Sequence, residues 1–144
     1  MNQPLDFTTM FETEIVRIIR VATAENFLFG RTPDGRPWDA VTQFTLDHRE
    51  NSAKHDDELP LQDTGHLMGQ ALFNPEIVAT PDTLHYIVDV PYAARHQFGG
   101  ESESGKQVPQ RKFLGWTPEM IAEAKKAVGA EAAAQLRARF RRAG

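Results

Sequence analysis

Residues 11–27 read FETEIVRIIRVATAENF, and this stretch decides the fold more than any other part of the chain. Its apolar residues recur every three to four positions, which is the period of one helical face. They are Phe11, Ile15, Ile18, Ile19, Val21 and Ala22. Thr8 or Thr9 is a candidate N-cap, and Gly30 followed by Pro33-Asp34-Gly35 supplies a stop and a turn. The pattern predicts an N-terminal amphipathic helix of about four or five turns.

Two short segments in the middle of the chain have the pattern of β-strands. Residues 84–90 alternate between apolar and polar positions, which is typical of a half-buried strand. Residues 77–80 are the expected partner, and Pro81-Asp82 is suited to the turn between them. Further upstream, Asp63-Thr64-Gly65 can cap a short helix that leads into the strands. We expect a small antiparallel sheet beside the N-terminal helix.

The C-terminal third predicts one or two further helices. Thr117-Pro118-Glu119 combines a hydroxyl cap, a proline at the first helical position and an acid in the first turn. An apolar stripe follows at Met120, Ile121, Ala124 and Val128. Gly129 either ends this helix or kinks it, because residues 131–142 are rich in alanine and favour a helix again. The predicted fold class is therefore α+β, with a small antiparallel sheet packed against helices.

Composition limits the class of protein. The 144 residues (16.2 kDa) fit one domain over 1–144. Cysteine is absent, so neither a disulfide nor a thiolate metal site can form. No basic start with an apolar run opens the chain, and no stretch reaches the roughly 18 apolar residues of a membrane span, so we expect no membrane partner. The net charge of −4 argues against a dedicated nucleic-acid binder.

Charge is nevertheless uneven along the chain. The helix end at about 131–144 carries four arginines and no acid after Glu131. They are Arg137, Arg139, Arg141 and Arg142. The simpler interpretation is a solvated helix end that the helix dipole favours, and the alternative is weak, nonspecific contact with DNA phosphates.

The sequence contains few residues in the spacing of a catalytic, phosphate-binding or metal-binding motif. The five histidines do not form an HExxH spacing, the serines lack a GxSxG elbow, and Gly105-Lys106 is followed by glutamine rather than by the serine or threonine of a phosphate loop. His55, Asp56 and Asp57 could offer ligands to a metal, which leaves a small metal-binding protein or enzyme as the alternative function. Hydration of this polar segment is the simpler interpretation. We therefore expect no catalytic residue and no cofactor.

Two motifs in the second half of the chain belong together. Residues 91–100 read PYAARHQFGG, and residues 108–115 read VPQRKFLG. They resemble the PYAxxHQFGG-like and IPARPFLG-like segments of the phage virion morphogenesis family, the tail-completion proteins of long-tailed phages. Residues 33–38 and 61–67 are similar to its PDGxxW and LxDTGxL elements. The chain departs from the family at Gln110-Arg111-Lys112, which lacks the usual proline, and in its arginine-rich end.

The resemblance implies a structural protein of the virion, assembled in the host cytoplasm. It would complete or terminate the tail at the end nearest the head and help to join tail and head. Its implied partners are further copies of itself in a ring, expected to be a hexamer, the tail tube or tail terminator protein, and the connector proteins of the head. A ring through which DNA passes could place the C-terminal arginines along its lumen.

The motif residues are candidates for the protein interface. They are Tyr92, His96, Gln97, Phe98, Arg111 and Phe113. Aromatic side chains beside arginine are typical of interface hot spots, and residues 99–107 (GGESESGKQ) are predicted to be a mobile, solvent-facing loop. The alternative places the aromatic residues in the core and has His96 and Gln97 satisfy buried backbone groups. For Arg111 and the loop we favour contact with a neighbour.

Overall fold

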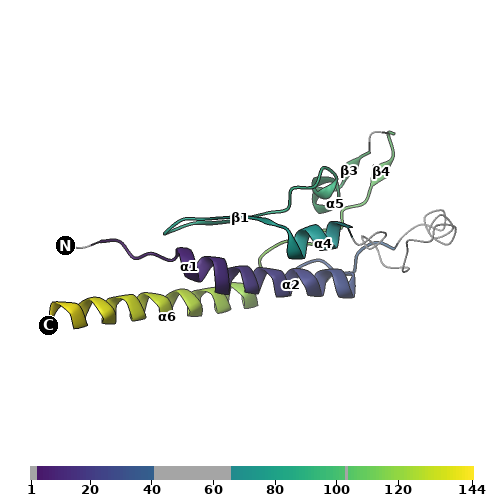
Figure 1. The fold of residues 1–144 in the computed structure, drawn as a ribbon. Coiled ribbons are helices and arrows are strands. Elements are labelled where there is room, and N and C mark those ends of the chain that lie inside the picture. The colour runs from purple at the N-terminus through teal and green to yellow at the C-terminus, as the bar shows by residue number, and fades with distance from the viewer. Residues whose placement is uncertain (1–2, 41–65, 103) are drawn as a thin grey trace.

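The computed structural model describes residues 3–40, 66–102 and 104–144. An N-terminal helix runs through α1 (Thr8–Met10), the π-helical turn η1 (Phe11–Ile15) and α2 (Val16–Phe29) (Figure 1). It ends at Gly30, whose φ of 59° and ψ of 47° lie in the left-handed region that glycine adopts most readily. The predicted amphipathic helix is confirmed.

The start of this helix differs from the prediction. Neither Thr8 nor Thr9 caps it with its side chain, because Phe7 occupies the N-cap position. The Asp6 carboxylate instead accepts hydrogen bonds from the backbone N–H of Thr8 at 2.9 Å and from its hydroxyl at 2.6 Å. These bonds hold the pKa of Asp6 below its usual value. An acid two residues upstream thus satisfies one of the free amides of the first turn.

The central strands form the predicted hairpin, although the second strand ends at Ile87 rather than at residue 90. Strand β1 (Glu76–Ala79) pairs antiparallel with β2 (Leu84–Ile87), and Ile77 lies opposite Tyr86. The turn closes through a hydrogen bond from Thr80 N to Thr83 O at 2.9 Å. Helix α4 (His66–Phe73) precedes the hairpin, and the three residues proposed to cap it lie outside the described part of the chain.

Residues 93–102 and 104–108 form a second unit above the helices (Figure 1). Helix α5 (Ala93–Phe98) leads into strand β3 (Gly100–Glu101), which pairs antiparallel with β4 (Gln107–Val108). The segment predicted as a loop is therefore a small hairpin that projects from the body (Figure 1). Its described residues are mostly exposed, as expected for a solvent-facing segment.

Helix α6 (Pro118–Ala143) is a single helix of 26 residues that returns along the N-terminal helix (Figure 1). Its start follows the prediction, since the Thr117 hydroxyl accepts from Met120 N at 3.2 Å. Gly129 does not end it. Ile121 is 42% exposed, so its place in the predicted apolar stripe is wrong, and Ala127 takes part in the packing instead.

Two apolar clusters hold the fold together, and the fold class is α+β. The first lies where α2, α4 and α5 meet residues 108–116, and it is built on Phe27, Trp38, Leu67, Ala71, Val90, Ala93 and Phe113. The second lies between the N-terminal helix and α6, and it is built on Met10, Ile15, Ile18, Ile19 and Met120.

Candidate interaction surfaces

Gln97 links the two sequence motifs from inside the molecule. Its side-chain oxygen accepts from the backbone N–H groups of Phe113 and Leu114, both at 3.1 Å. Its side-chain nitrogen donates to Leu114 O at 2.6 Å. The Phe113 carbonyl accepts from the buried Asn26 side chain at 3.0 Å. The interpretation that Gln97 satisfies backbone groups is therefore the one that its contacts support.

Arg111 also acts inside the chain. Its guanidinium donates to Asp39 O at 2.9 Å and to Ala40 O at 3.2 Å, and its backbone N–H donates to His96 O at 2.7 Å. The residue is only 9% exposed, and Phe113 is 2% exposed. Neither side chain offers a partner much surface. We therefore reassign Arg111 and Phe113 from the predicted interface to the interior, as the alternative foresaw for the aromatic residue.

The other motif residues lie nearer the surface. Tyr92 packs against the first cluster, and its ring centroid lies 6.1 Å from that of His96. The His96 Nδ1 atom is buried and has no hydrogen-bond partner among the described residues. Burial, helped by the positive charge of Arg111, lowers the pKa of His96. Phe98 is 74% exposed and sits beside the β3–β4 hairpin, so contact with a partner through Phe98 stays a prediction.

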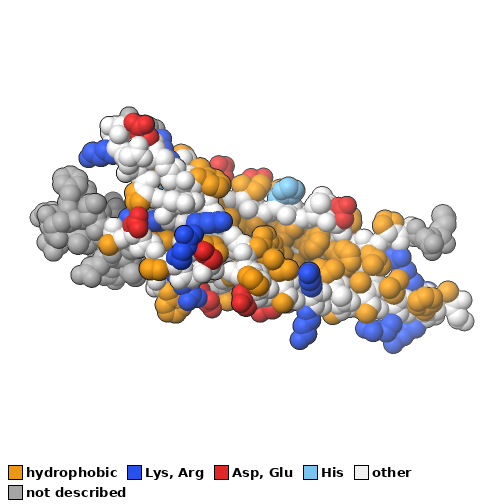
Figure 2. Space-filling view, turned by 180° about the vertical axis from the view of Figure 1, so that it is seen from behind, with side chains coloured by type: hydrophobic (Ala, Val, Ile, Leu, Met, Phe, Trp, Pro, Cys, Tyr) orange, Lys and Arg blue, Asp and Glu red, His pale blue; other side chains and the backbone are white. Residues whose placement is uncertain are grey.

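An open apolar groove lies on the face of the molecule that is turned away from the viewer in Figure 1. The sequence patterns did not reveal it. Figure 2 shows a continuous hydrophobic surface there, running between the β1–β2 hairpin and α6. The groove has a volume of about 500 Å³. Its lining residues come from four separate segments: Phe11, Ile15, Ile19, Leu84, Tyr86, Leu114, Gly115, Trp116, Met120, Ala124 and Val128.

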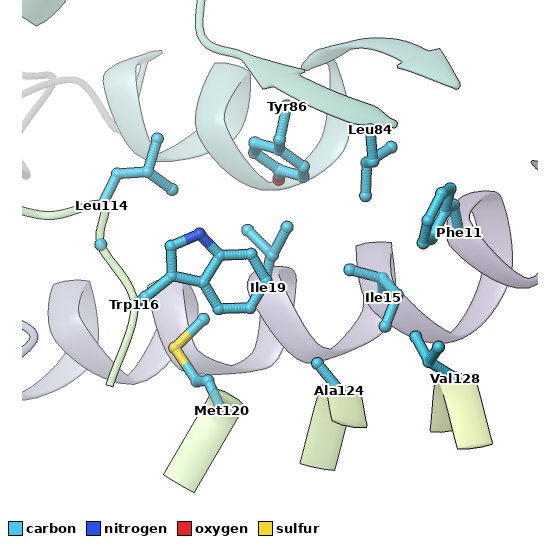
Figure 3. Close-up of a pocket in the computed structure, with 11 residues that line it drawn as sticks. Phe11, Ile15, Ile19, Leu84, Tyr86, Leu114, Trp116, Met120, Ala124 and Val128 are labelled. Atoms are coloured by element: carbon cyan, nitrogen blue, oxygen red, sulfur yellow. The ribbon is translucent and has the colours of Figure 1, made fainter. Parts of the chain in front are cut away.

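Two aromatic side chains shape this apolar groove (Figure 3). The Tyr86 hydroxyl donates to the carbonyl of Ala71 in α4, which fixes the ring against the wall. Burial raises the pKa of Tyr86 above its ordinary value. Trp116 stands at the opening and is 53% exposed. A large exposed indole beside an apolar hollow is typical of a surface that meets another protein.

The C-terminal arginines divide into two kinds. Arg139 donates to the carbonyls of Gln3 and Pro4, the latter at 2.8 Å, and so holds the N-terminal segment against α6. Gln135 takes part in the same clamp, because it accepts from Asp6 N at 3.0 Å and donates to Asp6 O. Arg139 is therefore reassigned from a DNA contact to a structural one. The exposed members of the set are Arg137, Arg141 and Arg142.

The structure covers only part of the chain that the metal-site and membrane predictions concern. His55, Asp56 and Asp57 lie outside the described residues. Within residues 3–40, 66–102 and 104–144, no three acids or histidines gather as metal ligands would. None of the helices in these same ranges is long and apolar enough to cross a membrane.

Comparison with known proteins identifies the chain. The sequence model of the phage virion morphogenesis family matches residues 1–132, which include both motifs, the apolar groove and most of α6. No curated protein and no solved structure matches the chain. The match leaves out residues 133–144, which form the last part of α6 and carry all four C-terminal arginines. The chain belongs to the phage virion morphogenesis family.

Proposed function

We propose that this virion protein acts in the phage neck, where it completes the tail at its head-proximal end and helps to join it to the head. The family match over residues 1–132 carries the proposal, because it assigns the chain a role in building the virion. Copies would assemble into a closed ring, expected to have six members like the tail. Contacts between proteins would do this work, without catalysis or a cofactor.

The surfaces of the described residues support a ring. A ring closes only when each subunit presents two different surfaces that fit each other. One candidate is the apolar groove, with Trp116 at its opening. Others are the β3–β4 hairpin with the exposed Phe98, and the far end of α6, where Phe140 is 75% exposed. These surfaces lie on different parts of the molecule (Figures 1 and 2), which suits contacts to both ring neighbours and to the tail.

The lumen of such a ring would pass DNA, and Arg142, which is exposed near the end of α6 on the side of the helix away from Phe140, could line it. The test replaces Arg142 by glutamine and leaves Arg139 in place, because Arg139 holds the N-terminal segment. Particles should assemble normally but deliver DNA less well, with infectivity reduced by about tenfold or more. Unchanged infectivity would remove the DNA contact from the proposal without affecting the neck assignment.

Disabling the gene in the parent phage tests the assignment to the neck. We expect electron micrographs of the lysate to show filled heads and separate tails, and we expect added purified protein to restore joined particles. Tails of irregular length would place the protein at tail termination. Normal joined particles without the protein would contradict the proposed function.

A further inference from the structure

The apolar groove has a floor and two walls, each formed by a different element. Its floor comes from the N-terminal helix, one wall from β2 and the other from α6 (Figure 3). Leu84 and Tyr86 point into it from the strand, and Met120, Ala124 and Val128 do so from the helix. Its long shape, parallel to α6, is of the kind that takes the apolar face of a helix.

The far end of α6 offers such a face. Leu136 and Phe140 are four residues apart, so they lie one above the other on the helix, and they are 43% and 75% exposed. Arg137 and Arg141 repeat the same spacing one position further on, so they border the apolar pair. From residue 132 to the end the chain has four arginines and no acid. We call residues 132–143 the α6 arm.

The hairpin and the α6 arm carry opposite charge. The hairpin and its flanking residues, 74–94, contain the exposed acids Glu76, Asp82 and Asp89 and no lysine or arginine. The pairing of Glu76 with Ile87 puts Glu76 on the outer face of the hairpin, so it does not line the groove itself. Figure 2 shows acidic side chains on that side of the apolar surface and basic ones at the end of α6. The other rim, on α6, carries both signs, with Glu123 beside Lys125 and Lys126. An apolar helix face bordered by arginines therefore fits with those arginines toward the hairpin.

We propose that the apolar groove receives the α6 arm of a second copy of this chain. Phe140 and Leu136 would fill the hollow beside Trp116, and Arg137 and Arg141 would face the acidic hairpin. The contact is head to tail, so one copy's arm and the next copy's groove repeat around a ring. The inference rests on the proposed ring and names the contact that closes it.

Cysteine cross-linking tests this contact inside the assembled particle. The chain has no cysteine, so a pair introduced at Phe140→Cys and Trp116→Cys is the only one that can react. Mild oxidation of particles carrying the double variant should give a ladder of linked copies up to the full ring. Trp116→Cys alone should stay unlinked. Dimers from Phe140→Cys alone would mean that arms meet each other, and they would overturn the proposal.

The remaining outcomes separate this contact from the neck assignment. A missing ladder from particles that contain the double variant, together with wild-type self-association in Phe140→Asp and Trp116→Glu, would contradict the groove contact and leave the neck assignment standing. Wild-type protein that is absent from finished particles would overturn both. Phe73→Cys serves as the control partner for Trp116→Cys, because Phe73 is 74% exposed on α4 and therefore matches Phe140 in exposure. That pair should give no ladder.

Mixing two defective variants tests the head-to-tail geometry in solution. Phe140→Asp removes the arm's apolar end, and Trp116→Glu puts a charge at the opening of the groove; both sites are exposed enough for the fold to tolerate the change. Each variant alone should self-associate at least about tenfold more weakly than the wild type. Their equimolar mixture should form a one-to-one dimer and stop there, because only one intact arm and one intact groove remain. A mixture as weak as its components would contradict the proposal.

Discussion

The Gln97 side chain binds the Leu114 backbone at both ends: its nitrogen donates to the Leu114 carbonyl at 2.6 Å, and its oxygen accepts from the Leu114 N–H at 3.1 Å. One residue of the PYAARHQFGG motif thus fixes the VPQRKFLG motif as a neighbouring strand would. The Gln97 side-chain oxygen also accepts from Phe113 N, which directs the Phe113 ring into the first apolar cluster. The two motifs are linked because they hold the same part of the fold.

Replacing Gln97 by alanine should lower the free energy of unfolding by about 2–3 kcal/mol, because backbone groups of Phe113 and Leu114 lose their partners. Urea unfolding followed by circular dichroism measures this. Gln110→Ala is the control, since the exposed Gln110 side chain makes one hydrogen bond to the described part of the chain, to Gln97 O, and its loss should cost about 0.5 kcal/mol. Equal losses in the two variants would contradict the role assigned to Gln97.

Two glycines should respond to alanine in opposite directions. Gly99 has φ 73° and ψ −177°, which other residues avoid, and an added Cβ would lie 3.3 Å from the Gln110 backbone nitrogen. Gly99→Ala should therefore destabilise the protein by about 1–3 kcal/mol. Gly129 lies within α6 with nothing near its missing Cβ, so Gly129→Ala should stabilise by about 0.5–1 kcal/mol. Thermal melts of both variants would show the contrast, and shifts of the same sign would refute it.

His96 should make stability depend on pH. Burial, with the Arg111 charge, lowers the pKa of His96 below its ordinary value, so as the pH falls the unfolded chain takes up this proton at a higher pH than the folded chain does. The stability that this histidine contributes is present above about pH 6.5 and is lost as the pH falls through its folded pKa. His96→Leu removes the titrating group. The wild type should lose stability relative to this variant from about pH 7 to about pH 5, and parallel curves would contradict the expectation.

The clamp on the N-terminal segment should show in hydrogen exchange. Gln135→Ala removes the acceptor of the Asp6 amide, which should then exchange about three to ten times faster, as expected from the loss of one exposed hydrogen bond. Arg137→Ala is the control. Arg137 lies two residues further along α6 and is exposed, so its replacement leaves the clamp intact and should not change this rate. An unchanged rate in Gln135→Ala would show that other contacts protect Asp6.

Local patterns were enough to predict the main elements. The 3.6-residue period located the N-terminal helix, the hydroxyl cap at Thr117 located the start of α6, and the alternation over residues 84–90 located β2. Each signal is short in range and depends on neighbours within a turn or a strand. These patterns could not decide whether the helix continues through Gly129. A glycine in a helix lowers its stability by only about 1 kcal/mol, and the alanines around it favour a helix.

Long-range contacts decided the site residues, and sequence patterns do not contain them. Arginine is a residue type common at interfaces, but the Arg111 guanidinium donates to the carbonyls of Asp39 and Ala40, which lie 72 and 71 positions away in the sequence. Arg139 resembles its exposed neighbours in sequence and differs only because residues 3 and 4 lie against it. The apolar groove draws its lining from four segments and has no local signature at all.

The most direct test of the neck assignment is to image the purified protein bound to its own tail tubes by electron microscopy, after light scattering has given its mass in solution. We expect a ring, either already formed in solution or formed on the tube, that covers one end only. A protein that stays monomeric at every concentration and never binds a tube end would contradict it.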